Sequence, residues 1–204
     1  RIGSAKAFAL AQNDSRLAVG DRNSVRVWAL PEGDLRLRLN SSRYNNNIAA
    51  LSPSGTWLAL ADPRGDGSIR MWDTTRVRET GRGRGGDWPD ANLCAAPEDQ
   101  PAPAATALQY SRLGGGRFWA GDARGRLLMW NEPTTSQKEA EVKQQKLPPV
   151  VLPEVILSEL FASPVTVLCG TPNAEFANIV ATGHADGSVR LWDTQNKKLI
   201  ATMM

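Results

Sequence analysis

Four short stretches of the sequence resemble one another, and each ends in tryptophan. They read SVRVW at 24–28, SIRMW at 68–72, RLLMW at 126–130 and SVRLW at 188–192. Each alternates side-chain type with the period of two that marks a half-buried strand. A polar turn precedes each stretch, and a second apolar run precedes each turn, ending at Gly20, Ala61, Gly121 and Gly183. Because the glycine, asparagine and aspartate of these turns tolerate positive φ, the sequence predicts the same β-hairpin four times.

Further apolar stretches flank each hairpin and extend the repeat to four strands. Upstream candidates lie at 7–10, 48–51, 105–108 and 165–168. Downstream candidates lie at 35–39, at 77–80, within 150–161 and at 199–203. Repeated four-stranded units stack as the blades of a β-propeller, so we expect an all-β fold with four antiparallel blades.

The spacing of the repeats predicts two insertions. Only the interval from Trp28 to Trp72 fits the period of about 40–45 residues for such a blade. The two longer intervals place insertions at 81–103, rich in glycine, proline and charge, and at 132–146, which is polar. We therefore expect one propeller region over 1–204, with blades near 5–40, 46–80, 104–161 and 163–204.

Two of the copies resemble a known family. DGSIRMWD at 66–73 and DGSVRLWD at 186–193 are similar to the signature of WD-repeat β-propellers, and SPSGTWLALA at 52–61 resembles their first-to-second strand connection. The match is weaker in the first and third copies, which have alanine and asparagine after the tryptophan. Since members of the family usually close a ring of seven blades, the resemblance implies a partial or fragmentary ring, either part of a longer protein or an open half-ring completed by another chain. A four-bladed ring is the alternative.

The resemblance also implies structural roles within each blade. It assigns blade-structural roles to Trp28, Trp72, Asp73, Trp130, Trp192, Asp193, Asp66 and Asp186. In the family, a turn aspartate, a histidine of a Gly-His pair, a serine or threonine and the tryptophan form a hydrogen-bonded network. No Gly-His pair precedes a first strand here, and we expect the only histidine, His184, to be a polar turn residue. The complete network is therefore expected to be absent from every blade.

The sequence offers little for catalysis. One histidine cannot build a multi-histidine metal site, and there is no HExxH, CxxC pair or Gly-x-Ser-x-Gly motif. The GRGRGG segment at 81–86 lacks the Gly-Lys-Ser/Thr of a phosphate-binding loop. We expect no enzyme activity, catalytic residue, cofactor, metal or small-molecule substrate.

Charge and cysteine content indicate the setting only broadly. The net charge of +3 and pI of about 9.1 permit nucleic-acid binding without implying it. Two cysteines outside any CxxC pair fit a reducing compartment. No apolar run reaches the 18 or more residues of a membrane span, and the N-terminal apolar stretch is too short for a signal peptide. We expect an intracellular protein, cytoplasmic or nuclear, without membrane insertion.

Two groups of residues are candidates for partner binding. Arg82 and Arg84, followed by Trp88, have the composition of RNA-contacting segments, although a basic loop that binds protein or nothing has the same composition. In the family, the turns between second and third strands share one face of the disc with the connections between blades. That face would gather Arg22, Arg43, Tyr44, Arg64 and Arg124. Convergent arginines of this kind hold acidic or phosphorylated peptides through bidentate hydrogen bonds.

These observations lead to one functional expectation and one alternative. We expect a non-catalytic interaction scaffold, a WD-repeat subunit or domain whose partners are other protein subunits of a larger intracellular assembly. The alternative is a WD-repeat component of a ribonucleoprotein complex that contacts RNA through basic loops. Salt distinguishes the two, because affinity for phosphates falls steeply as ionic strength rises.

Overall fold

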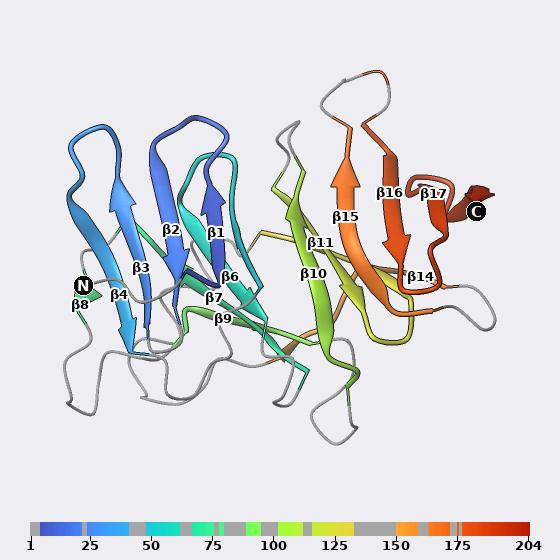
Figure 1. Ribbon diagram of the computed structural model, residues 1–204, viewed down its shortest axis with the longest axis horizontal. Helices are drawn as coiled ribbons and strands as arrows, with labels where there is room; N and C mark the ends of the chain where they lie inside the picture. Colours follow the sequence, from blue (N-terminus) through green and yellow to red (C-terminus); the bar gives the residue numbers. More distant parts are fainter. Residues whose placement is uncertain are drawn as a thin grey trace.

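The computed structural model describes residues 5–21, 24–40, 48–61, 67–75, 78–79, 89–94, 102–111, 116–132, 150–158, 163–171, 175 and 177–204. These residues form strands and turns, arranged in four sheets. The sheets follow one another along the long axis of the molecule, from the blue first sheet to the red fourth sheet in Figure 1. The first and fourth sheets therefore lie at opposite ends, and the four blades form an open arc.

The first two sheets each contain five strands. The first has the order β1-β2-β3-β4-β8, with β1 Ala7–Leu10, β2 Arg16–Gly20, β3 Ser24–Ala29, β4 Leu35–Asn40 and β8 Arg78–Glu79. The second has the order β13-β9-β7-β6-β5, with β5 Ala49–Leu51, β6 Trp57–Ala61, β7 Ile69–Asp73, β9 Ala91–Leu93 and β13 Val150–Val151. In both, four antiparallel strands make the blade and the fifth strand is parallel to its outer edge.

The last two sheets are four-stranded and antiparallel. The third comprises β10 Ala105–Tyr110, β11 Arg117–Asp122, β12 Leu127–Asn131 and β14 Val155–Leu157. The fourth comprises β15 Val165–Gly170, β16 Ile179–His184, β17 Val189–Asp193 and β18 Lys198–Met203. The expected all-β fold of four antiparallel blades is confirmed, and so is its partial ring.

The outer strand of the second blade lies elsewhere than expected. The prediction placed it at 77–80 and assigned 81–103 to an insertion. In the structure, Arg78–Glu79 pairs with β4 of the first blade, and Ala91–Leu93 pairs with β7 as the fourth strand of the second blade. Part of the expected insertion is thus a core strand, with Ala91 and Leu93 buried. Most of the other expected insertion, residues 133–146, lies outside the described residues.

Strands β8 and β13 connect neighbouring blades. Each follows the third strand of its own blade, crosses to the outer edge of the preceding blade, and precedes the return to its own fourth strand. The link at β13 includes a side chain, because the Trp130 indole nitrogen Nε1 of the third blade donates to the Val151 carbonyl oxygen at 2.9 Å. The first three blades are therefore joined along their outer edges as well as through their faces.

Three apolar clusters lie between the four sheets, one at each junction. Trp72 packs in the cluster with side chains of the first sheet, Trp130 with those of the second, and Trp192 with those of the third. All three indoles are buried, as are Trp57 and Trp119 of the second strands. Since each buried indole removes a large apolar area from water, these clusters provide most of the favourable free energy of stacking.

Aspartate side chains fix the hairpin turns between second and third strands. In the first blade the Ser24 amide donates to Asp21 Oδ1 at 2.8 Å, and in the third the Arg124 and Arg126 amides both donate to Asp122 Oδ1 at 2.9 Å. The third turn also contains Gly125 with φ of 77°, a conformation that glycine adopts at no steric cost.

No helix among the described residues is long and apolar enough to cross a membrane.

Candidate protein-interaction surfaces

The register of the strands gives every blade two different faces. On one face the marker tryptophan stands opposite a residue of the second strand, as Trp72 does opposite Leu58 and Trp192 opposite Val180. This face packs against the preceding blade. The opposite face packs against the following blade, and in the first blade it carries the smaller side chains Val25 and Val27. At the second and third junctions this receiving face carries Trp57 and Trp119.

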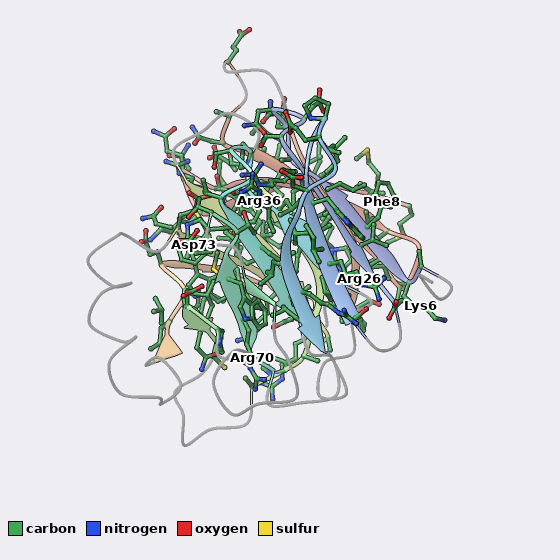
Figure 2. The ribbon with its side chains drawn as sticks, turned by 90° about the vertical axis from the view of Figure 1, so that its left-hand side faces the viewer. Lys6, Phe8, Arg26, Arg36, Arg70 and Asp73 are labelled. Atoms are coloured by element: carbon green, nitrogen blue, oxygen red, sulfur yellow. The ribbon has the colours of Figure 1, made fainter. Side chains whose placement is uncertain are left out.

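The first blade has no described blade against its tryptophan face. We call this surface the leading face; its members, by register, are Phe8, Leu10, Leu17, Val19, Arg26 and Trp28. Phe8 is 74% exposed and Leu10 is 50% exposed. Leu51, which corresponds to Leu10 on the first strand of the second blade, is only 6% exposed. Figure 2 shows the end of the molecule formed by this sheet, with Phe8 and Arg26 labelled.

The marker tryptophan of the first blade differs from the other three. Trp28 lies on the leading face and is only half-buried, whereas Trp72, Trp130 and Trp192 are almost completely buried. Three of the four indoles thus lie in the apolar core, and the fourth lies in the corresponding place of the first blade with no described blade packed over it.

The fourth blade exposes the other kind of face. We call it the trailing face; its members, by register, are Val167, Cys169, Ala181, Val189, Leu191 and Met203. Val167 is 57% exposed and Met203 is 48% exposed, but Leu39, which corresponds to Met203 in the first blade, is fully buried. Contiguous exposed apolar side chains of this kind mark interaction surfaces on soluble proteins.

Basic side chains flank the apolar centre of the leading face. Arg26 and Arg38 stand directly opposite each other on neighbouring strands, and Arg36 lies close by on the same strand as Arg38. The Arg36 Nη2 atom lies 3.9 Å from Asp34 Oδ2, so at least one of these arginines already has an acidic neighbour within the chain.

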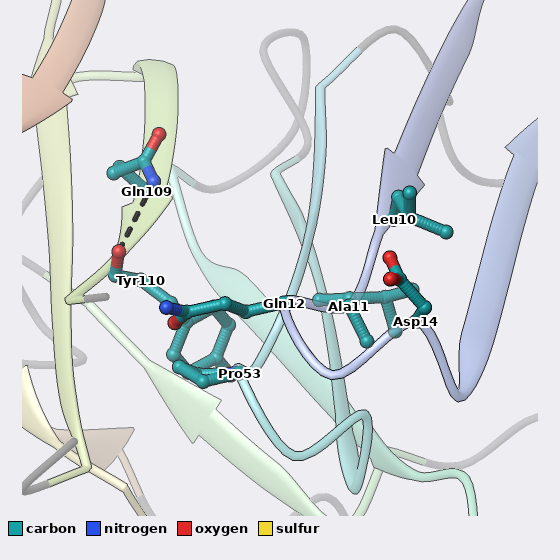
Figure 3. A pocket seen from close by; sticks show the side chains of 8 residues that line it. Leu10, Ala11, Gln12, Asp14, Pro53, Gln109 and Tyr110 are labelled. Carbon is teal, nitrogen blue, oxygen red and sulfur yellow. Dashed lines mark hydrogen bonds between the residues drawn. The ribbon is translucent and has the colours of Figure 1, made fainter. Parts of the chain in front are cut away.

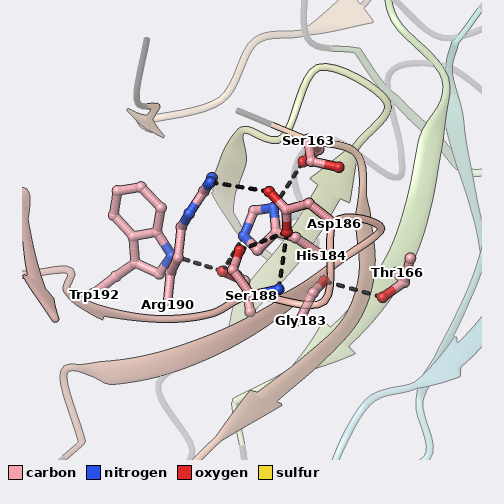
Figure 4. A network of polar contacts seen from close by, with 9 residues as sticks. Ser163, Thr166, Gly183, His184, Asp186, Ser188, Arg190 and Trp192 are labelled. Carbon is pink, nitrogen blue, oxygen red and sulfur yellow. Dashed lines mark hydrogen bonds and ion pairs between the residues drawn. The ribbon is translucent and has the colours of Figure 1, made fainter. Parts of the chain in front are cut away.

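The fourth blade contains a buried hydrogen-bond network that differs from the expectation. The Trp192 indole nitrogen Nε1 donates to Thr182 Oγ1 at 2.9 Å, and that oxygen is 2.7 Å from His184 Nε2. The other ring nitrogen of His184, Nδ1, is 2.7 Å from the Ser163 carbonyl oxygen. We call Trp192, Thr182, His184 and Ser163 the fourth-blade network; Figure 4 labels Trp192, His184 and Ser163. His184 is thus the buried last residue of β16, not a residue of the turn as expected.

Aspartates at the strand ends hold local backbone geometry. Asp186 Oδ1 accepts from the Ser188 hydroxyl at 2.6 Å and from its amide at 2.9 Å, and these hydrogen bonds lower the pKa of the Asp186 carboxyl. Hydrogen bonds from Asn196 likewise lower the pKa of Asp193. Asp73 accepts from the amide and hydroxyl of Thr75. These contacts give the three aspartates a structural role, while Asp66 lies outside the described residues.

A hollow of about 320 Å³ lies where the first strands of three blades end (Figure 3). Leu10, Leu51 and Tyr110 come from those strand ends, and Gln12 and Asp14 add polar groups. Burial, with a smaller contribution from Glu132, raises the pKa of the Tyr110 hydroxyl well above its ordinary value. The Tyr110 side chain is 3% exposed, so its phenol is part of the wall of the hollow.

The structure describes only one of the predicted contact residues. Arg124 is exposed on the turn between β11 and β12. The turns do share a face with the connections between blades, because the Ala123 amide donates to the Ala104 carbonyl oxygen at 3.0 Å and that of Ala185 to Pro164 at 2.9 Å. The other predicted contact residues lie outside the described residues: Arg22, Arg43, Tyr44, Arg64, Arg82, Arg84 and Trp88.

Sequence reasoning missed the leading and trailing faces. The signal was present, since the first and last units of a stacked repeat each have one face without a neighbour. Applying the period of two to those two units would have selected the same side chains.

Among the described residues there is no group of three or more histidine, cysteine, aspartate or glutamate side chains placed to hold a metal ion.

Comparison with known proteins agrees with this architecture. The family model "WD domain, G-beta repeat" matches residues 40–73 and 157–193. No curated protein matched the chain as a relative. The first match ends at Asp73 and covers the first three strands of the second blade, and the second ends at Asp193 and covers those of the fourth. The chain carries WD repeats, and they fold as blades of a partial β-propeller.

Proposed function

We propose that this chain is a non-catalytic scaffold within a larger intracellular multiprotein assembly. WD repeats in general serve as protein-interaction scaffolds. The specific support comes from the two end faces of the arc. Both expose, at equivalent register positions, side chains of the kind that are buried at the three internal junctions.

The physical reason is the free energy of leaving such surface in water. Burial of apolar area contributes roughly 25 cal/mol per Å². Phe8, Val167 and Met203 are each about half or more exposed, so packing another protein surface over them gains free energy. A rigid stack of sheets holds the end faces fixed, which lowers the entropy cost of association.

Affinity isolation of the tagged chain tests this proposal. We expect protein partners that remain after nuclease treatment and that are retained when the salt concentration is raised from 50 to about 200 mM, a change that weakens phosphate-dominated complexes by ~10³-fold or more. Two variants are compared in this assay. Arg124→Ala alters a predicted contact residue on a hairpin turn, and Phe8→Glu alters the leading face. Loss of all partners on nuclease treatment would favour the ribonucleoprotein alternative.

A further inference from the structure

We propose that the hollow at the ends of the first strands binds a lysine or arginine side chain from a segment of a partner protein. The hollow is lined by three consecutive blades of the chain, and its volume of about 320 Å³ is near the lower end of the ~300–1,000 Å³ of ligand pockets. The two end faces carry the scaffold proposal and the hollow carries this one, so either can fail without the other.

Part of the hollow is apolar. Ala11 of the first blade and Leu51 of the second are buried, and Tyr110 of the third blade and the half-buried Pro53 continue this surface. Figure 3 shows Tyr110 and Pro53 on one side of the hollow and Asp14 on the other. A ligand with an apolar stem and a charged end matches this division. Lysine and arginine are such ligands, because their methylene stems cover apolar surface while the charged group stays in a polar place.

The charge around the hollow is acidic. Asp14 is the only charged residue among the described residues that line it, and its exposed side chain forms no ion pair or hydrogen bond with any residue that the structure describes. Glu132 adds negative potential at the wall, since its charge contributes to the raised pKa of the Tyr110 hydroxyl. Arg16, two residues after Asp14, donates from Nη1 to the Ser15 carbonyl oxygen at 2.8 Å. The hollow therefore favours a cation over an anion.

Two glutamines add hydrogen-bond acceptors beside the carboxylate. Gln109 Nε2 donates to the Tyr110 carbonyl oxygen at 3.1 Å, which orients the Gln109 amide and leaves Oε1 to accept. Gln12 is exposed and also lines the hollow. The ammonium of lysine has three donors and the guanidinium of arginine has five, so either group can bond to an amide oxygen as well as to Asp14.

The turn that carries Asp14 is held in place by the chain itself. The Asp14 amide donates to the Ala11 carbonyl oxygen at 3.0 Å, and the Asn13 amide donates to the Pro53 carbonyl oxygen of the second blade at 3.1 Å. Asn13 Nδ2 also donates to the Ser54 carbonyl oxygen at 3.2 Å. Because the turn is fixed to the neighbouring blade, the entropy cost of ordering the site on binding is low.

A protein segment makes more contacts here than a free amine or guanidine does. The hollow is bordered by turns whose residues Gln12, Asn13 and Ser54 are exposed. A side chain seated in the hollow would bring the residues on either side of it against these turns. Interfaces of this kind have one anchoring side chain in a pocket and weaker contacts around it.

Titration of the ¹⁵N-labelled chain with capped pentapeptides tests the site. Each peptide carries one test residue between alanines: lysine, arginine, citrulline, norleucine or glutamate. The lysine and arginine peptides should shift the side-chain amide signals of Gln12 and Gln109. Citrulline has the shape of arginine without its charge, and its peptide should bind about threefold or more weakly. The glutamate peptide should not bind.

Asp14→Asn removes the charge with little change of shape. Asparagine tolerates the positive φ of 54° at this position, so the turn should keep its conformation. The variant should bind the lysine and arginine peptides about threefold or more weakly than the unmodified chain does. Glu32→Gln is the matched control, because it removes the same charge from the exposed turn between β3 and β4 and should leave the affinity unchanged. Melting curves confirm that both variants are folded.

Four results would overturn the inference. The absence of any shift at millimolar peptide would exclude the site, and equal affinity for the arginine and citrulline peptides would exclude recognition of charge. Unchanged affinity in Asp14→Asn would place the binding elsewhere. Ethylguanidinium binding as tightly as the arginine peptide would show that a free cation, not a protein segment, is the ligand. Partners retained in affinity isolation by a chain that binds none of the peptides would exclude the hollow and leave the scaffold proposal intact.

Discussion

Replacing Leu93 by alanine tests whether the segment after the second blade's third strand belongs to the core. Leu93 lies on β9, stands opposite Ile69, and is 1% exposed within the cluster between the second and third sheets. Removing most of a fully buried leucine side chain costs ~2–5 kcal/mol, from lost transfer free energy and the cavity left behind. Because Leu93 lies in a cluster of buried side chains from two sheets, its neighbours have little freedom to fill that cavity, and we expect the upper half of this range.

The magnitude translates into a clear thermal shift. For a chain of this length each kcal/mol lowers Tm by ~2–4 °C, so Leu93→Ala should melt about 7–20 °C below the unmodified chain. Differential scanning calorimetry measures the shift. Leu152→Ala is the matched control, since that leucine is 49% exposed and its loss should change stability by no more than about 0.5 kcal/mol.

Equal melting temperatures for the two variants would refute the reasoning. They would mean that residues 91–93 form a surface loop, as the sequence pattern alone predicted. Deletion of residues 83–99 gives the same test at larger scale, because it removes β9 and with it the outer edge on which β13 pairs. A deletion variant that retained the full cooperative transition would likewise exclude the strand.

Four other substitutions test the junctions, the fourth-blade network and a hairpin turn. Trp72→Ala should cost ~3–5 kcal/mol by denaturant unfolding, and Trp28→Ala clearly less in dilute solution because Trp28 is half-buried; equal losses would contradict the two-face description. Thr182→Val keeps the side-chain shape but leaves two buried nitrogens of the fourth-blade network without their partner, which should cost ~1–3 kcal/mol; an unchanged free energy of unfolding would exclude the network. Asp186 has a lowered pKa in the folded chain, so its hydrogen bonds to Ser188 stabilise the fold above the unfolded pKa of about 3.9 and are lost as pH falls through the folded pKa. The difference in Tm between the unmodified chain and Asp186→Ala should therefore be largest near neutral pH and vanish in strong acid, and a pH-independent difference would contradict this assignment.

Most strands were predictable because their own side chains alternate. LRLRL at 35–39 and WLALA at 57–61 are bounded by turn residues, and the structure places β4 and β6 there. The strand at 91–93 could not be found in this way, since it is three residues long and has asparagine at its centre. Its position is decided by the edge of β7 and by the apolar side chains across the junction, which is tertiary context and not local propensity.

The role of His184 was also beyond local reasoning. The sequence HADG is typical of a turn, and the turn does begin at the following residue. Two hydrogen bonds hold the ring of His184 in the strand. One ring nitrogen contacts the hydroxyl of Thr182 on the same strand, and the other contacts the carbonyl oxygen of Ser163 in the connection that enters the blade. The sequence separation of Ser163 and His184 hides that contact.

Strands β8 and β13 have a consequence for how the chain folds during synthesis. The outer edge of the first blade gains its fifth strand only after residues 78–79 have left the ribosome, when three strands of the second blade are already outside. The edge of the second blade likewise waits for residues 150–151, which follow the third strand of the third blade. Each nascent blade thus keeps an unpaired edge, open to wrong pairing, until its successor is largely made. Folding from the N-terminus therefore proceeds with overlap between neighbours, and pausing translation between these points would expose the edges for longer.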